Sequence, residues 1–349
     1  MSPTSTMLSL LVLIALLRLA TAQSFIILDT GLYQSGTSAL QSPTSLRRLP
    51  QDGSNSTTLA QFTAASTANS APTGAHALAY SPSSALLFSA TSQGLISTKL
   101  DGSGASNILS DNNAKQIPGL TVAEKEQKIY YSDPSTTSIK KADFNGTNTE
   151  LVRNVSQGTD FYATGLVVDE ARGWIYWSAT SSTNSDRGSI FRAALNGTGD
   201  AQLLVSGISA VPGQLRIVVD SLYWLENTPS ATSIKYLDRF ISQLPPTPTT
   251  TSFIPVPTGV LISSSQSSLF SVVNDAGEVQ KLAVSSFYVY RDDFNHTVWL
   301  VAKSVGRNVF AMLVEVVWRG SGGSRGPVFK VLSQGVATLG VPVGLEYVR

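Results

Sequence analysis

Two histidines and one Gly-x-Ser-x-Gly pentapeptide are the residues that could form a hydrolase site. The pentapeptide, Gly322 to Gly326, matches the nucleophile elbow, in which a strand, a sharp turn and a helix present a serine. Here it lies between two apolar runs typical of strands, so we interpret it as a loop. His76 begins an apolar run, and His296 is the middle residue of a sequon in an expected tight turn. We therefore assign both histidines structural roles and predict no catalytic residue.

Carboxylates at the ends of apolar runs are a second group that could do chemistry. The four are Asp169, Asp220, Asp292 and Glu346. If these runs line a channel, the carboxylates could converge on a hard cation such as calcium. They could instead accept local hydrogen bonds in turns. We favour the second reading and predict no metal, because no set of Asn and Glu residues accompanies them.

An internal repeat supplies the elements that would position these groups. The segment KIYYSDPSTTSIKKADFNGTNTELV, residues 128 to 152, recurs as WIYWSATSSTNSDRGSIFRAALNGTGDAQLLV, residues 174 to 205. Each unit has four short runs rich in Val, Ile, Tyr, Phe and Trp, which predict strands. Asn-Gly or Asp-Gly precedes the fourth run and predicts a tight hairpin with positive φ at both turn residues. Four strands in a period of about 40–47 residues predict a β-propeller.

The units differ in clarity along the chain. Three are plain: Leu78–Leu109, Gly119–Val152 and Gly165–Val205. A fourth begins at Ile217 and ends near Phe253–Val256, a fifth begins with Val260–Ser263, Leu269–Val273 and Glu278–Val284, and a sixth begins with Phe287–Asp292 and Thr297–Ala302. With the N-terminal unit this gives seven blades. The last spacing is short, so six blades, with Glu278–Asp292 inside one elaborated blade, is the alternative.

The two ends of the chain hold complementary pieces of one unit. The N-terminal unit, Phe25 to Phe62, lacks a first strand, and residues 343–348 (VGLEYV) are a strand with no partner after it. We predict that this C-terminal strand joins the N-terminal blade and closes the ring, because a ring left open would expose strand edges.

Adjacent aromatic residues recur in the second run of each middle unit. Neighbouring residues of a strand point to opposite faces. Because both faces of a blade pack on neighbours, we predict that these pairs form inter-blade core: Tyr130 and Tyr131, Tyr176 and Trp177, Tyr223 and Trp224. Trp174 and Trp299, if exposed, would mark a binding patch instead.

The first 22 residues are typical of a secretory signal peptide. Leu8 to Leu17 is an apolar run of ten, shorter than a membrane span, and Ala20-Thr21-Ala22 resembles a cleavage site. Arg18 follows the run instead of preceding it, which leaves a retained anchor as the alternative. Residues 23–349 then form a single propeller domain with a Ser/Thr-rich loop at about 51–75. Val309–Trp318 is interpreted as a strand, not a span.

Composition narrows the classes of partner. The net charge is +1 and only 13% of residues are charged, so nucleic acid is not expected. There is no cysteine, hence no disulfide and no thiol chemistry. Five sequons behind a signal peptide predict N-glycosylation: Asn55, Asn145, Asn154, Asn196 and Asn295. We expect a secreted, extracellular glycoprotein with no transmembrane segment.

Three second runs resemble a known family. IYYSD (129–133), IYWSA (175–179) and LYWLE (222–226) are similar to the YWTD repeats of low-density lipoprotein receptor propellers. The resemblance implies a propeller of six blades and extracellular ligand binding. Its fourth-position aspartate is kept at Asp29 and Asp133 and replaced in three units: Ala90, Ala179 and Glu226. The family's cysteine-rich flanking modules are absent, so a lipoprotein or Wnt-type partner does not carry over.

These observations support a secreted, glycosylated, non-enzymatic propeller that binds an extracellular protein or glycan. The alternative is a calcium-dependent hydrolase of the lactonase type, with its site in the central channel. A structural role at a cell surface is a third reading. Because a fold hosts many functions, the step from propeller to binding rests on resemblance.

Overall fold

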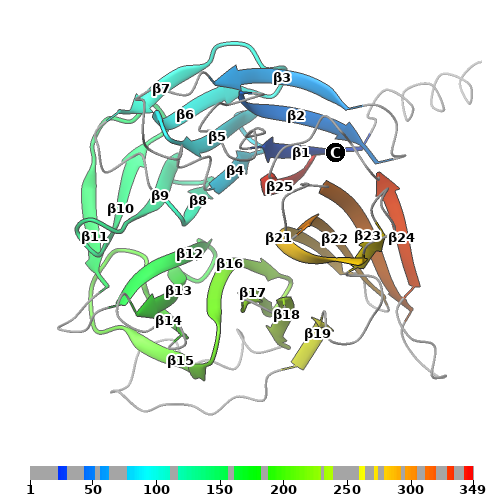
Figure 1. The fold of residues 1–349 in the computed structure, drawn as a ribbon. Coiled ribbons are helices and arrows are strands. Elements are labelled where there is room, and N and C mark those ends of the chain that lie inside the picture. Colours follow the sequence, from blue (N-terminus) through cyan, green and yellow to red (C-terminus); the bar gives the residue numbers. More distant parts are fainter. Residues whose placement is uncertain are drawn as a thin grey trace, which may run out of the picture.

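The computed structural model describes most of the chain as short β-strands arranged in a ring (Figure 1). The described residues are 23–29, 43–51, 56–62, 77–110, 117–155, 161–181, 188–228, 232–238, 259–263, 271–273, 279–291, 295–304, 311–319, 328–333 and 342–348. The expected signal peptide, most of the Ser/Thr-rich loop, His76, Asp292, Asn55 and the pentapeptide at 322–326 lie outside them. No helix in this described part is long and apolar enough to cross a membrane.

Six antiparallel sheets are formed by the described strands, and we call them blades 1 to 6 in chain order. Blade 1 contains β25 (Pro342–Val348), β1 (Ser24–Asp29), β2 (Thr44–Pro50) and β3 (Thr57–Phe62). Blade 2 contains β4 (Ala77–Ser81), β5 (Leu86–Thr91), β6 (Gly94–Lys99) and β7 (Ser106–Leu109); blade 3 contains β8 (Leu120–Ala123), β9 (Lys128–Asp133), β10 (Ser138–Asp143) and β11 (Glu150–Asn154).

The other three blades complete the ring. Blade 4 contains β12 (Phe161–Asp169), β13 (Trp174–Ser181), β14 (Gly188–Ala194) and β15 (Gln202–Ile208); blade 5 contains β16 (Val211–Val218), β17 (Ser221–Asn227), β18 (Thr232–Leu237) and β19 (Gly259–Ser263). Blade 6 has five strands: β20 (Ser271–Val273), β21 (Val279–Arg291), β22 (Asn295–Ser304), β23 (Ala311–Arg319) and β24 (Val328–Ser333). The predicted β-propeller is confirmed.

The C-terminal strand closes the ring as the sequence predicts. β25 pairs with β1 along its length, with Phe25 opposite Tyr347 and Ile27 opposite Leu345. Leu345 is fully buried and Val348 nearly so. The last strand of the chain thus becomes the innermost strand of the first blade, so a β-ladder joins the two ends of the ring.

The described strands form six blades, not seven, as in the alternative that places Glu278–Asp292 inside one elaborated blade. The assignments that led to seven are wrong between residues 259 and 291. Val260–Ser263 was expected to begin a fifth repeat, but β19 pairs with β18 as the outer strand of blade 5. Glu278–Val284 and Phe287–Asp292 were expected to belong to different blades, but Val279–Arg291 is one long strand, β21. An apolar run shows that a strand forms; the run does not show which neighbour the strand pairs with.

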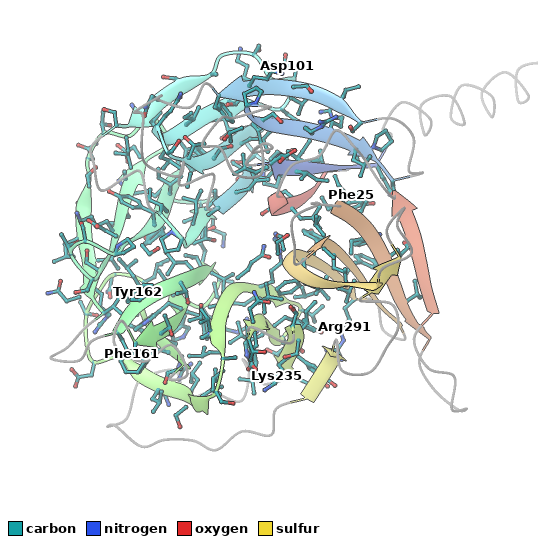
Figure 2. The ribbon with its side chains drawn as sticks, viewed as in Figure 1. Phe25, Asp101, Phe161, Tyr162, Lys235 and Arg291 are labelled. Carbon is teal, nitrogen blue, oxygen red and sulfur yellow. The ribbon has the colours of Figure 1, made fainter. Side chains whose placement is uncertain are left out.

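The aromatic pairs fill the spaces between blades as predicted. Within each pair the two rings belong to different clusters: Tyr130 packs between blades 3 and 4, while Tyr131 packs between blades 2 and 3. Side chains occupy these interfaces all around the ring (Figure 2). Trp174 and Trp299, considered above as exposed binding residues, are only 6% and 4% exposed, so they form core.

The Asp-Gly and Asn-Gly hairpins form, but with a different turn from the one expected. Gly146 N–H donates to Asp143 O and Asp143 N–H donates to Thr147 O, a three-residue loop with glycine in the left-handed region. Asn145 does not need positive φ, because in a three-residue loop only the last position, here Gly146, is left-handed. The Oδ1 of Asn145 accepts from the N–H and hydroxyl of Thr147. Asp101 and Asn196 make the same two bonds, to Ser103 and Thr198.

Candidate functional site: the central channel

One strand of each blade borders a central cavity of about 490 Å³, and we call these the inner strands: β25, β4, β8, β12, β16 and β21. The strand registers place one residue per blade at the same depth. This ring of residues consists of Tyr80, Thr121, Val167, Arg216, Tyr288 and Glu346, and all six line the cavity. Arg216, Tyr288, Glu346 and Tyr80 follow one another from blade 5 to blade 2, and Thr121 and Val167 complete the ring.

One end of the channel is narrowed by glycines near the starts of the inner strands. A Cβ built on Gly165 would lie 2.2 Å from Gly213 O, and one on Gly344 would lie 2.5 Å from the Leu78 Cβ. Only glycine permits backbones to approach this closely. The opposite end carries the turns 82–85, 124–127, 170–173 and 219–220, and we call that side of the ring the turn face.

Arg216 and Glu346 form the charged centre of the channel. Two guanidinium nitrogens of Arg216 donate to the two carboxylate oxygens of Glu346, at 3.2 and 2.9 Å. Arg216 also donates to Leu345 O at 2.7 Å and to Phe287 O at 2.9 Å, and its guanidinium lies 4.8 Å from the centre of the Tyr288 ring. This arrangement links blade 5 to the closing strand across blade 6.

The environment of Glu346 opposes its ionisation. Its side chain retains 12% of its exposure, and burial raises the pKa of Glu346 above its usual range although Arg216 acts in the opposite direction. A bidentate guanidinium–carboxylate pair of this kind holds its partners in a fixed geometry. The pair therefore fastens the ring closure, and its hydrogen-bonding groups are occupied by protein.

Two of the other three carboxylates considered for a cation, Asp169 and Asp220, lie at the turn face, and Asp292 is outside the described residues. Asp169 pairs with Arg172 at 2.9 Å and also accepts from the Arg172 N–H, while Asp220 lies 3.4 Å from a second nitrogen of the same guanidinium. Within the described ranges, no three His, Asp or Glu residues lie close enough together to hold a metal ion. The structure brings Asp169 and Asp220 to one arginine, and places Glu346 beside another.

Carboxylates at the turn face reach from each blade back to the preceding one. Glu124 of blade 3 accepts from Ser81 and Ser83 of blade 2. Glu170 of blade 4 accepts from three successive backbone N–H groups, those of residues 124, 125 and 126. Together with Arg172 and Asp220, these contacts join blades 2, 3, 4 and 5 around the channel mouth.

The fourth position of the YWTD-like motif has a structural role within its own blade. Asp133 pairs with Lys140 on the adjacent strand at 2.6 Å, and Glu226 pairs with Lys235 in the equivalent place at 2.8 Å. In blade 4 the same two positions hold Ala179 and Phe191, so the acid and the base are both absent. Where the acid of the motif is replaced in blade 4, the basic residue on the adjacent strand is therefore replaced with it.

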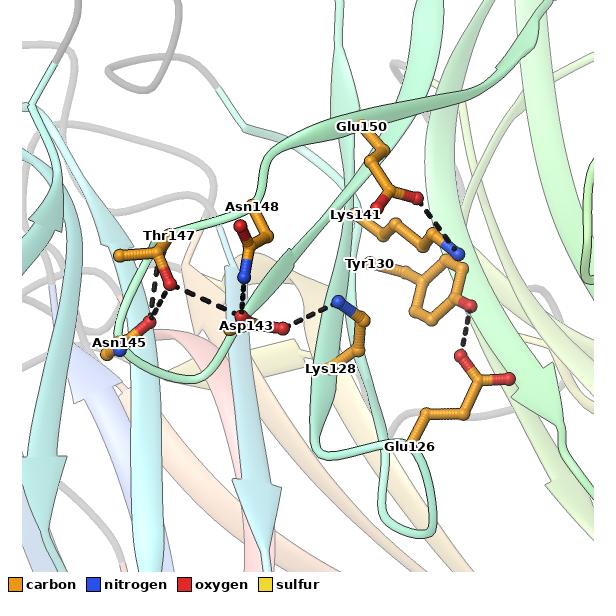
Figure 3. A network of polar contacts seen from close by, with 9 residues as sticks. All are labelled: Glu126, Lys128, Tyr130, Lys141, Asp143, Asn145, Thr147, Asn148 and Glu150. Atoms are coloured by element: carbon orange, nitrogen blue, oxygen red, sulfur yellow. Dashed lines mark hydrogen bonds and ion pairs between the residues drawn. The ribbon is translucent and has the colours of Figure 1, made fainter.

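Two of the sequons lie on equivalent hairpins of blades 3 and 4. Asn145 and Asn196 are both exposed, and each amide oxygen accepts from the hydroxyl of its sequon threonine at 2.7 Å. Figure 3 shows the hairpin of Asn145, with Asp143 held by Lys128 and Asn148 beside it. Asn154 is exposed at the end of β11, and Asn295 begins β22. His296, expected in a tight turn, lies in β22 opposite Arg291.

Arg216 was not singled out by sequence reasoning. The sequence feature that could have identified Arg216 is its position on the inner strand. Among the equivalent inner-strand residues of the described blades it is the one cation, and the others are aromatic, apolar, hydroxyl-bearing or acidic. The register that aligns Arg216 with Glu346 depends on ring closure, so the pair is found only once the two strands are placed.

Comparison with known proteins supports the resemblance. No family model matches the chain. A low-density lipoprotein receptor-related protein 1 of Pyricularia oryzae is 26% identical over an alignment of 149 residues that covers 37% of this chain and 46% of that protein. The chain thus spans less than half the length of this relative. It is a distant relative of a protein of the low-density lipoprotein receptor class.

Solved structures match the fold over nearly the whole chain. One chain of a nidogen–laminin complex has a TM-score of 0.54 and 13% identity, covering 94% of this chain and 98% of its own length. TolB from Acinetobacter baumannii has a TM-score of 0.52 and 12% identity, covering 93% of this chain and 66% of its own. At these identities the likeness is one of fold. The chain is an all-β propeller with a YWTD-like repeat.

Proposed function

We propose that the protein is a secreted, glycosylated β-propeller that binds an extracellular protein or glycan and is not an enzyme. The observation that carries the proposal is the state of the channel centre, where Arg216 and Glu346 use their polar atoms on each other and on backbone carbonyls. Chemistry at this centre would first have to break the contact that fastens the ring. Binding through the surface leaves that contact intact.

The hairpin sequons support secretion and glycosylation. Their amide groups are exposed at turns, and their threonine hydroxyls already contact the amide oxygens. Glycans there would add polar surface to a chain with only 13% charged residues. The equivalent turn of blade 2 has Asp101, which accepts the same two hydrogen bonds but has no amide nitrogen to which a glycan could be attached.

That natural aspartate gives a conservative test of glycosylation. The full chain is produced in a eukaryotic secretory host, and Asn145→Asp and Asn196→Asp variants are compared by intact mass before and after enzymatic glycan removal. We expect each variant to lose one glycan mass and to keep its melting temperature within a few degrees, because Asp101 shows that aspartate forms this turn. A secreted protein whose mass is unchanged by either substitution would refute glycan attachment at that hairpin.

Two further measurements distinguish a binding protein from a calcium-dependent hydrolase. The purified protein is screened against arrays of extracellular protein domains and of glycans, and calcium is titrated by calorimetry with Asp220→Ala as the control. We expect a saturable partner on the arrays and no heat from calcium. Calcium heat that disappears in Asp220→Ala, with ester or lactone hydrolysis that requires calcium, would instead establish the hydrolase.

A further inference from the structure

Exposed apolar side chains gather where the channel opens on the turn face. Among the described residues, three large hydrophobic side chains are exposed: Leu151 at 59%, Val219 at 73% and Tyr290 at 40%. Val219 follows β16 and Tyr290 lies at the end of β21, the inner strands of blades 5 and 6. Between them, half-buried Val218 lines the cavity and packs against the core shared by these blades. Two of the three exposed residues thus border the same mouth.

The backbone at Val219 makes this exposure unusual. Val219 has φ +57°, in the left-handed region that favours glycine or asparagine and that β-branched residues rarely adopt. The side chain contributes little to packing, since 73% of its surface is exposed. The turns of blades 2 and 3 also hold a left-handed residue, at Ala85 and Gln127, so the backbone conformation belongs to the turn. The exposed apolar side chain that Val219 adds there is not explained by the stability of the turn.

Inside the mouth, three valines line the cavity between the turns and the deeper ring of residues: Val122, Val218 and Val289. The Arg216–Glu346 pair and the Tyr288 ring form the floor, at the depth of the residue ring described above. The cavity of about 490 Å³ extends as far as the turns, where Pro82 and Glu124 line it.

The charge around the mouth is negative. The described turns and adjoining inner-strand ends of blades 3, 4 and 5 carry five carboxylates against two cations, a formal balance of −3. The carboxylates are Glu124, Glu126, Asp169, Glu170 and Asp220, and the cations are Lys125 and Arg172. Beside Tyr290, the cation Arg291 is paired with Asp238, so it leaves this balance unchanged. Salt bridges neutralise some of these groups locally, but the summed field still favours a cationic partner.

We propose that the turn-face mouth of the channel is the docking site for a protein loop that inserts an apolar side chain flanked by Lys or Arg. The apolar residue would contact Val219, Tyr290 and Val218, and the cations would lie over the acidic turns. This deepens the proposed binding function by naming its surface and the chemistry of its partner, and it rests on that function. A buried apolar anchor with a charged rim is the arrangement in which a few residues carry most of the binding energy.

A display library of disulfide-cyclised twelve-residue peptides, selected on the full glycosylated chain, is the probe. Enriched peptides are synthesised and measured by calorimetry against the wild type and three variants: Val219→Gly, Val219→Leu and Leu151→Ser. We expect peptides with an apolar residue beside Lys or Arg. Val219→Gly weakens their binding about tenfold or more while raising the melting temperature, because glycine relieves the left-handed strain. Val219→Leu and Leu151→Ser retain binding.

Several results would overturn the site. If Val219→Gly binds the selected peptides as tightly as the wild type, they dock elsewhere, and the general binding function survives without this surface. If peptides with their Lys and Arg replaced by Glu bind equally well, the charge argument fails. A library that yields no enriched peptide, in a preparation that binds an array partner, also rejects a channel-mouth site.

Discussion

Blades 2 to 4 and the closing sector of blades 5, 6 and 1 hold the ring together in different ways. In the first region each hairpin glycine lies against the outer strand of the preceding blade: a Cβ on Gly102, Gly146 or Gly197 would lie 2.0–2.4 Å from a carbonyl there. The contact is made by backbone and recurs once per repeat. In the closing sector the corresponding link is a pair of side chains, Arg216 and Glu346, that occurs once.

This difference explains why the sequence repeat becomes less regular towards the C-terminus. Neighbouring units that follow one another in sequence can use the same contact each time, so the same residues recur. The closing contact joins strands that are 130 residues apart and occurs between unlike partners. Arg216 and Glu346 therefore need not match the repeat. Their charges and hydrogen bonds hold the interface that closes the ring.

Removing the C-terminal strand β25 should have the largest effect on the closing sector of blades 5, 6 and 1. Deletion of residues 342–349 takes away the ladder to β1, the buried Leu345 and Val348, and the partner of Arg216. We expect loss of the cooperative melting transition, because the exposed edge and the unpaired Arg216 both destabilise the ring. Circular dichroism melting measures the effect.

A peptide complementation control makes this result specific. A synthetic peptide of residues 342–349 should restore part of the transition, whereas a scrambled peptide should not. If the truncated chain melted at the wild-type temperature, β25 would not be needed for closure, and the comparison between the two regions would fail.

Breaking the ion pair alone should have the next largest effect. Glu346→Ala leaves Arg216 in the channel without its carboxylate, and we expect a loss of about 3–5 kcal/mol in unfolding free energy. Arg216→Met and Glu346→Leu made together should cost less than the sum of the same two changes made singly. Chemical denaturation of the four proteins gives the coupling. Additive losses would show that the residues do not act as a pair.

The pH dependence of the same contact has a defined sign. Burial raises the pKa of Glu346 in the folded protein. The contribution of Glu346 to folding stability is therefore fully present below its unfolded-state pKa of about 4.3, and it is lost as pH rises through its folded-state pKa. The stability difference between the wild type and Glu346→Gln should therefore favour the wild type more at pH 4 than at pH 7. An increase of that difference with rising pH would contradict the assignment.

Hairpin glycines offer the matching test in blades 2 to 4. Gly146→Ala introduces a Cβ 2.0 Å from Ile108 O at φ +84°, and we expect a loss of roughly 2–4 kcal/mol from strain and overpacking. Gly173→Ala is the control, since Gly173 has φ +71° but nothing within 4 Å of the added atom. Its loss should be about 1 kcal/mol. Equal losses would mean that the inter-blade approach contributes nothing.

The same contrast explains which features could be predicted from sequence. The hairpins, the buried aromatic pairs and the closing strand follow from patterns that repeat or that lack a partner. The boundary between blades 5 and 6 does not, because β19 and β21 have apolar sequences that fit either an inner or an outer strand. Arg216 could not be assigned because its role depends on a register set across the ring.

The smallest expected effect concerns the acid–base pair within blade 3. Burial alone would raise the pKa of Asp133, but Lys140 and the hydroxyls of Ser135 and Thr136 hold it below its usual range. Its stabilising contribution is therefore present above the unfolded pKa of about 3.9 and is lost as pH falls through the folded value. We expect Asp133→Ala to lower stability by about 1 kcal/mol at pH 7 and by less at pH 3.

Blade 4 supplies the rescue for this substitution. It carries Ala179 and Phe191 where blade 3 has Asp133 and Lys140, and the Phe191 ring stacks on Trp177. Lys140→Phe should therefore recover part of the loss when added to Asp133→Ala, because a ring in this position can stack on Tyr131. Thermal melting of both single variants and the double variant measures the recovery. If the double variant were as unstable as the sum of the singles, the two blades would not share interchangeable packing, and the repeat would be one of backbone alone.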